Sequence, residues 1–575
     1  MATAHDFRDN PTRLTAKKGW TARFRPNGVF MATAILALLM LLPIAAVLSS
    51  LFDTGRGSLG HLASTILPDL VINTLGLVCM VGLGTAVVGT GTAWLVSACR
   101  FPGSRFLQWM LLLPLAMPAY IIGYAYTDFL VFAGPLQTGL RELFGWTRND
   151  YWFPDIHSLW GVSVMLVLVL YPYVFFLART AFQEQSRGLL DVARTLGRSP
   201  WNVFTTVALP MARPAIAAGV ALALMEAIAD FGTVQYFGVQ TFTTAIYRTW
   251  FGMGDRVAAA QLASALLAFV FLLVALEHWS RSRQAYYDTS SRALKPQPVM
   301  LRGWSAAWAF VACALPVLLG FVVPVVILLD LHFDGGDSFL GNRLMVYAGN
   351  SFLLASGAAL IVTACAILTG YCLRRSSGGA GAGLVRLSTL GYAIPGTIIA
   401  VGILIPLGAF DNWFDGVMRN WFNISTGLVL SGSVIALLYA YTVRFLAVAN
   451  SAIETGFKRI PLHIDDVART LGRTRRGVII SVHLPLLRRS VLMSAAIVFV
   501  DVLKELPATL IVRPFNFDTL AVRVYQLASD ERLSEAATGS LVIVAIGLVP
   551  IFLLTRFADS RSGQISTAPA IKIPQ

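Results

Sequence analysis

Five ionisable residues interrupt stretches of the chain that are otherwise apolar. They are Glu226, Asp230, Asp501, Lys504 and Glu505. A charged side chain at membrane depth is costly unless it faces the interior of a helix bundle, a partner or water, so these residues are candidates for lining a route across a bilayer. A structural role is equally open, because Lys504 could pair with Asp501 or Glu505 in its own helix, or fasten two halves of the protein together.

The eight letters DVARTLGR occur twice, at residues 191–198 and 466–473. In both copies a proline follows the glycine thirteen residues later, which predicts a short helix, a turn at the glycine and a further helix that starts at Leu-Pro. A duplicated polar loop suits a partner with two equivalent sockets. An amphipathic helix that rests on lipid headgroups is the alternative. The residues expected to contact such a partner are Asp191, Val192, Ala193, Gly197, Leu209, Pro210, Asp466, Val467, Ala468, Gly472, Leu484 and Pro485.

Membrane helices must position these residues. The chain has 575 residues, of which 56% are hydrophobic and only 13% are charged, whereas about a quarter are charged in soluble proteins. We therefore expect an all-α polytopic membrane protein with about twelve transmembrane helices, each near the ~20 apolar residues that cross the hydrocarbon core. They are expected near 28–51, 71–98, 107–133, 158–179, 214–236, 261–277, 304–330, 349–373, 385–409, 426–447, 489–512 and 537–556.

Further landmarks recur at nearly the 275-residue offset of the motif. The matching pairs are Asn73 and Asn350, Pro118 and Pro395, Asp230 and Glu505, and Arg248 and Arg523. This pattern predicts two tandem repeats of about six spans, which share one orientation because six is even. The predicted units are a tail at 1–27, a first repeat at 28–277 with its loop at 185–213, a linker at 278–303, a second repeat at 304–556 with its loop at 448–488, and a tail at 557–575.

Basic residues predict the orientation of the chain. The N-terminal tail and every second loop after it are rich in Lys and Arg, and such loops are retained in the cytoplasm. Both termini and both DVARTLGR loops are therefore expected on the cytoplasmic side. The net charge of +14 is spread over many loops, without the clustered basic stripe that nucleic-acid binding uses.

Several kinds of chemistry find no support in the sequence. None of the six lysines follows a glycine, so the chain lacks the Gly-Lys of a phosphate-binding loop and is not expected to hydrolyse ATP. The five cysteines show no CxxC and no histidine at ligand spacing, so we expect no metal site. No catalytic group of side chains is evident, so we expect neither an enzyme nor a cofactor in this chain.

The DVARTLGR loops resemble the signature loop of importer permeases of the ATP-binding cassette superfamily. That loop reads Glu-Ala-Ala, three residues, Gly, nine variable positions and Ile-x-Leu-Pro, and here Asp replaces the Glu and Val replaces one Ala. The resemblance implies that each loop forms a coupling helix that docks in a groove of one of two ATPase subunits, which carry the ATP and Mg. It also implies a periplasmic substrate-binding protein as a partner and a location in the bacterial inner membrane.

The resemblance extends over nearly the whole chain. The fused two-unit layout is most similar to bacterial ferric-iron permeases through the segments DYWFP (150–154), ADFGTVQYFGVQTFTT (229–244), WFGMGDR (250–256) and KELPATLIVRPFNFDTLAVRVYQLASDER (504–532). It implies ferric iron as the cargo. The alternatives are a fused permease for thiamine or a phosphonate, and a secondary transporter driven by protons through the same carboxylates.

Overall fold

The protein is almost entirely helical. The structure, a computed structural model, describes residues 28–53, 64–185, 199–282, 299–338, 341–375, 379–461 and 463–563. Within these ranges the only strands are β1 (Cys99–Arg100) and β2 (Val299–Met300), which pair in parallel. The predicted all-α membrane fold is confirmed.

Ten helices of the described residues are long and apolar enough to cross a membrane. Their sequences are long apolar runs, which favour insertion into the hydrocarbon of a bilayer. A helix is the form that such a run takes there, because it satisfies its own backbone hydrogen-bonding groups where no water is available. The ten are α1 (Gly28–Ser49), α3 (Leu67–Ala98), α7 (Leu159–Glu184), α10 (Leu209–Ala229), α13 (Arg256–Ser282), α14 with α15 (Trp304–Val317 and Val323–Phe333), α16 (Asn342–Arg375), α18 (Gly396–Phe422), α19 (Val434–Lys458) and α25 (Leu533–Gly563).

Two of the expected spans have special shapes. The third is a bent pair, in which α4 (Ser104–Met110) and a 3₁₀ turn meet α5 (Ala119–Leu130) and α6 (Pro135–Phe144) at an angle of 91°; counted as one span, it gives eleven. The eleventh expected span is α22 (Leu484–Leu503) followed by α23 (Pro507–Val512). Three charged residues, Arg488, Arg489 and Asp501, lower the hydropathy of α22.

Shorter helices connect the long ones. They are α9 (Pro200–Val203), α11 (Gly232–Tyr236), α12 (Phe242–Tyr247), α17 (Gly379–Ser388), α20 (His463–Thr470), α21 (Arg475–Val478) and α24 (Leu520–Ser529).

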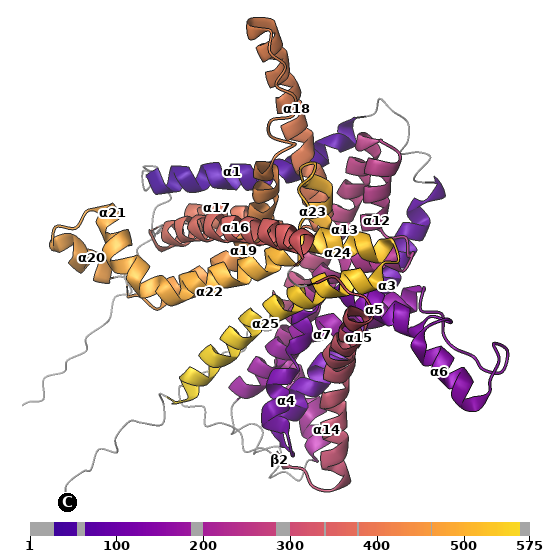
Figure 1. The fold of residues 1–575 in the computed structure, drawn as a ribbon. Helices are drawn as coiled ribbons and strands as arrows, with labels where there is room; N and C mark the ends of the chain where they lie inside the picture. The colour runs from indigo at the N-terminus through magenta and orange to yellow at the C-terminus, as the bar shows by residue number, and fades with distance from the viewer. Residues whose placement is uncertain are drawn as a thin grey trace, which may run out of the picture.

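The first span of each predicted repeat packs against the other repeat. α1 lies against α16, α17 and α18, whereas α14 and α15 lie against α3, α4 and α5 (Figure 1). The contact of α1 with α18 is backbone-close, since a Cβ on Gly402 would lie 2.4 Å from the carbonyl oxygen of Pro43. The π-helical turn between α14 and α15 (Leu318–Val322) approaches α7 as closely, since a Cβ on Gly320 would lie 2.7 Å from the carbonyl oxygen of Leu168. The two predicted repeats thus each place their first segment among helices of the other.

Matching residues of the two repeats make matching bonds. The Asn73 side-chain amide donates to the carbonyl of Gln240 at 3.0 Å, and that of Asn350 donates to the carbonyl of Asp518 at 3.1 Å. Each bond ties a long membrane helix to the loop beside a short helix, α12 in one half and α24 in the other. This agreement supports the tandem repeat that the sequence predicts.

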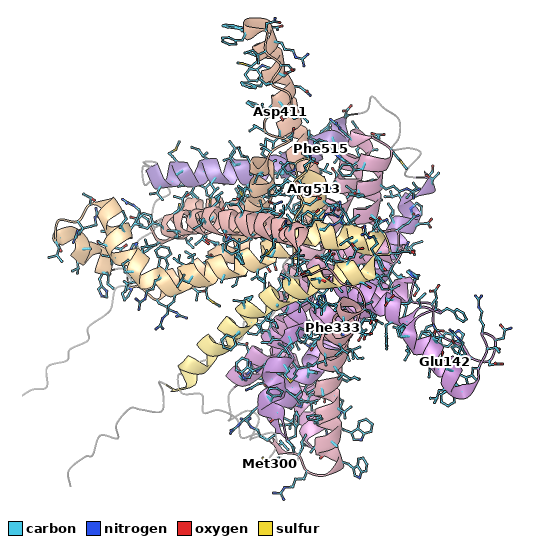
Figure 2. The ribbon with its side chains drawn as sticks, in the orientation of Figure 1. Glu142, Met300, Phe333, Asp411, Arg513 and Phe515 are labelled. Atoms are coloured by element: carbon cyan, nitrogen blue, oxygen red, sulfur yellow. The ribbon has the colours of Figure 1, made fainter. Side chains whose placement is uncertain are left out.

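Two hairpins project from the helical body. One contains α6, which carries Glu142, and the other is the distal end of α18, which carries Asp411 (Figure 2). Asp411 accepts hydrogen bonds from the backbone N–H groups of Leu430 and Ser431 at 2.9 and 2.8 Å, which closes the second hairpin.

Candidate functional site

The expected fifth and eleventh spans both break at a carboxylate. α10 ends at Ala229, and Asp230 then accepts hydrogen bonds from the backbone N–H groups of Thr233 and Val234 at 3.0 and 3.1 Å. The Thr233 hydroxyl also donates to this carboxylate, at 2.9 Å. Asp230 therefore caps the N-terminus of α11, because it satisfies amides that have no partner within that helix.

Glu505 has the same role in the second half. It follows α22 and accepts bonds from the N–H groups of Ala508 and Thr509, both at 3.0 Å, and from the Thr509 hydroxyl at 2.6 Å. For Asp230 a local signal was present, because this aspartate directly follows a mostly apolar run and aspartate is a preferred N-cap residue. The sequence predicted these residues only as the lining of a route or as part of a clamp, so the capping role is a finding of the structure.

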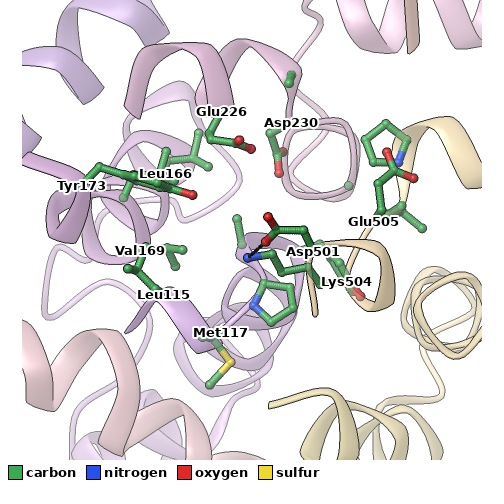
Figure 3. A pocket seen from close by; sticks show the side chains of 18 of the residues that line it. Leu115, Met117, Leu166, Val169, Tyr173, Glu226, Asp230, Asp501, Lys504 and Glu505 are labelled. Carbon is green, nitrogen blue, oxygen red and sulfur yellow. Dashed lines mark ion pairs between the residues drawn. The ribbon is translucent and has the colours of Figure 1, made fainter. Parts of the chain in front are cut away.

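All five ionisable candidates line one cavity between the halves. The cavity measures about 130 Å³ and also contacts Tyr120, Tyr173, Tyr392 and Arg444. Glu226 and Asp230 approach it from the first half, while Asp501 and Lys504 face them from the second (Figure 3). Lys504 pairs with Asp501 at 3.0 Å within one helical turn, which is one of the alternatives left open above.

Arg444 of α19 also lines this cavity, although the sequence did not predict a role for it there. Its guanidinium lies 3.3 Å from Glu505 and 3.8 Å from Glu226, and its side chain is only 12% exposed. A signal was present, because Arg444 stands alone among apolar residues within the tenth expected span. Its two carboxylate partners come from distant parts of the chain and could not be deduced.

The cavity offers oxygen atoms as ligands. Besides four carboxylates it has three phenols, and the hydroxyl of buried Tyr120 has no hydrogen-bond partner among the described residues. Within that same part of the chain, no group of three or more His, Cys, Asp and Glu side chains is arranged to hold a metal ion.

The second DVARTLGR loop folds as helix, turn and helix, in the order that the motif predicts. α20 contains Asp466, Val467 and Ala468, and Gly472 follows with a φ of +80°, a left-handed conformation that favours glycine. Val467 and Leu471 are 55% and 77% exposed. The exposed apolar side chains of Val467 in α20 and Leu471 at its end form a surface that a partner could cover.

Only the end of the first DVARTLGR loop lies within the described residues. Asp191, Val192, Ala193 and Gly197 lie outside the described residues. Leu209 and Pro210 begin α10 after a π-helical turn at residues 204–208, just as Leu484 and Pro485 begin α22 after one at 479–483.

An ion cluster around Asp465 holds α20 against the end of α16 and the start of α22. Arg374, at the end of α16, contacts Asp465 at 2.8 Å and also donates to the carbonyls of Ile460 and Pro461 at 2.7 and 2.9 Å. The other partner of Asp465 is buried His483, at 2.8 Å. Burial alone would raise the pKa of Asp465, but hydrogen bonds and charges from Arg374 and His483 outweigh it and lower that pKa.

Comparison with known proteins agrees with these features. Residues 87–286 match the family model described as a binding-protein-dependent transport system inner membrane component. An Fe(3+)-transport system permease protein, FbpB 2 of Haemophilus influenzae, is 25% identical over 85% of this chain and 90% of its own length. The ferric transport system permease protein FbpB of Actinobacillus pleuropneumoniae is 21% identical over 92% of this chain and 79% of its own.

A shorter relative matches a single unit. The molybdenum transport system permease protein ModB of Escherichia coli is 28% identical over 81% of its own length but only 32% of this chain. The present chain thus has room for a second unit of this kind. The match at residues 87–286, together with the similarity to both FbpB proteins over most of the chain, supports a permease of an ATP-binding cassette importer that joins two permease units in one polypeptide.

Proposed function

We propose that this permease translocates ferric iron that a periplasmic binding protein delivers, and that two copies of a separate ATPase drive the cycle. The chain itself is a multi-pass transport subunit of the inner membrane. Two full-length relatives carry names that specify Fe(3+) or ferric transport. Both termini lie in the cytoplasm in this proposal, as the basic loops predict.

The observation that carries the proposal is the cavity between the halves. It brings the carboxylates of Glu226, Asp230, Asp501 and Glu505 together with the phenol of Tyr120. Hard cations prefer oxygen ligands, and these groups supply only oxygen.

The DVARTLGR loops are the proposed contacts with the ATPases. Val467 of α20 and Leu471, which directly follows this helix, present exposed apolar side chains near the exposed Asp466, while Arg374 and His483 hold the start of α20 against α16 and α22. A helix anchored in this way can transmit movement of an ATPase to the membrane helices. The repetition of the loop supports two ATPase copies.

Reconstitution tests the cargo and the energy source together. Vesicles that contain the permease, its ATPase and its binding protein should accumulate ferric iron with ATP, and thiamine or 2-aminoethylphosphonate should not compete. Accumulation of thiamine or the phosphonate in place of iron would reject the cargo. Uptake that follows a proton gradient without the ATPase would reject the importer mechanism.

A further inference from the structure

The charges around the cavity are distributed unequally between the two halves. Its four carboxylates form two matching pairs at the 275-residue offset, Glu226 with Asp501 and Asp230 with Glu505. Its two cations, Arg444 and Lys504, both belong to the second half. At the same offset the first half has Val169 and Ala229, which also line the cavity but carry no charge.

Glu226 therefore depends on the other half for a counter-ion. Among the described residues its ion pair is with Arg444, at 3.8 Å, and no basic residue of the first half lines the cavity. Glu226 lies on α10 and Arg444 on α19, so this pair spans the interface between the halves. Lys504, by contrast, is paired within its own helical turn to Asp501.

The two contacts of Arg444 differ in strength. Glu505 is the firmer partner, because it lies 3.3 Å away, is 2% exposed and is itself held by amides of α23. Glu226 is farther away and 31% exposed. When the halves separate, the guanidinium should remain with Glu505 and release Glu226.

We propose that Arg444 is a positioning residue that latches the two halves across the cavity, anchored on Glu505 and closed on Glu226. This inference rests on the proposed function, because a latch has a role only if the halves move during transport. Release of Glu226 would expose an uncompensated carboxylate to the opened cavity, where a cationic cargo could take the place of the guanidinium.

The test measures the separation of the halves in the full-length chain. Spin labels are attached to cysteines at Thr180 and Thr455, exposed positions at the same repeat offset on α7 and α19, after the five native cysteines are replaced by alanine. Distance distributions are recorded in lipid nanodiscs without nucleotide, ATPase or cargo. The variants are Glu226→Gln, Arg444→Gln and the two combined.

We expect Glu226→Gln and Arg444→Gln each to broaden or shift the distance distribution. The double variant should resemble Arg444→Gln alone, because both changes remove the same contact between Glu226 and Arg444. Glu535→Gln is the matched control, since it breaks a local pair with Arg532, which immediately precedes α25. A wild-type distribution in Glu226→Gln, or additive effects in the double variant, would overturn the latch.

A second variant guards against poor accumulation of Arg444→Gln. Arg444→Lys keeps a cation between the carboxylates, so its distribution should stay closer to wild type than that of Glu226→Gln; the reverse order would also overturn the latch. The measurement needs neither cargo nor ATP. A failed transport assay would therefore count against the proposed function, whereas unchanged distances would count against the latch alone.

Discussion

Asp230 and Glu505 occupy matching positions in the two halves, and each caps the short helix that follows a break in a membrane helix. Both carboxylates also line the cavity between the halves. The same side chains thus shape the backbone at the break and add negative charge beside the route. Substitutions can separate these two roles.

Asp230→Asn should retain the cap, because asparagine is as good an N-cap as aspartate, but it removes a charge from the cavity. We expect stability near wild type together with reduced ferric-iron uptake. Asp230→Ala should in addition lose about 1 kcal/mol of stability. Thermal unfolding of the purified protein and uptake in vesicles measure the two effects, and equal destabilisation by Asn and Ala would contradict the capping role.

Gly472 should tolerate asparagine better than valine. A Cβ there would meet no atom within 4 Å, so the cost comes from the left-handed backbone rather than from a clash. That conformation costs about 1–2 kcal/mol for most residues and less for asparagine. Gly472→Val should weaken co-purification of the ATPase and lower transport, while Gly472→Asn retains most of both.

The matching glycine of the first half provides a second comparison. Gly197→Val should have the same effect as Gly472→Val if the two loops are equivalent. Full transport and normal ATPase retention in both valine variants, at wild-type abundance, would exclude the coupling role of the loops.

The attachment of α20 should persist until acid pH. Because the folded-state pKa of Asp465 is lowered, its contribution is fully present above the unfolded pKa of about 3.9 and is lost as pH falls through the lower, folded value. A spin label at exposed Thr470 should therefore keep a constant mobility from pH 7 to about pH 4 and become mobile below it. Mobilisation close to neutral pH would show that another group controls the attachment.

Removal of Asp465 should release α20 at all pH values. Asp465→Ala leaves the guanidinium of Arg374, which is 5% exposed, without its carboxylate partner. Breaking a buried pair in this way costs about 3–5 kcal/mol, and the remaining carbonyl contacts of Arg374 should reduce that cost. Label mobility at neutral pH and the thermal midpoint measure the change.

Chemical labelling can establish the topology. Single cysteines at Ser199 and Thr474 should react with an impermeant reagent only from the cytoplasmic side, whereas cysteines at Thr147 and Asn412 should react only from the periplasm. Reaction of Ser199 and Thr474 from opposite faces would show that the halves are inverted and would reject the importer arrangement.

Local features of this protein could be predicted from its sequence. The long apolar runs specify membrane helices because length and hydropathy suffice for insertion. The turn at Gly472 and the helix start at Leu484 follow from residue types a few positions apart. The capping of α11 by Asp230 was equally local, because aspartate is a preferred N-cap residue and Asp230 directly follows a mostly apolar run.

The contacts between distant helices were decided by the tertiary structure alone. The sequence places Glu226, Arg444 and Glu505 in three separate apolar segments, and their meeting depends on how the two halves pack. The packing of α1 and of the turn after α14 on helices of the other half likewise depends on close approaches at Gly402 and Gly320. Such contacts join residues 61 to 359 positions apart. Hydrophobic periodicity specifies that a helix face is buried without specifying which helix covers it.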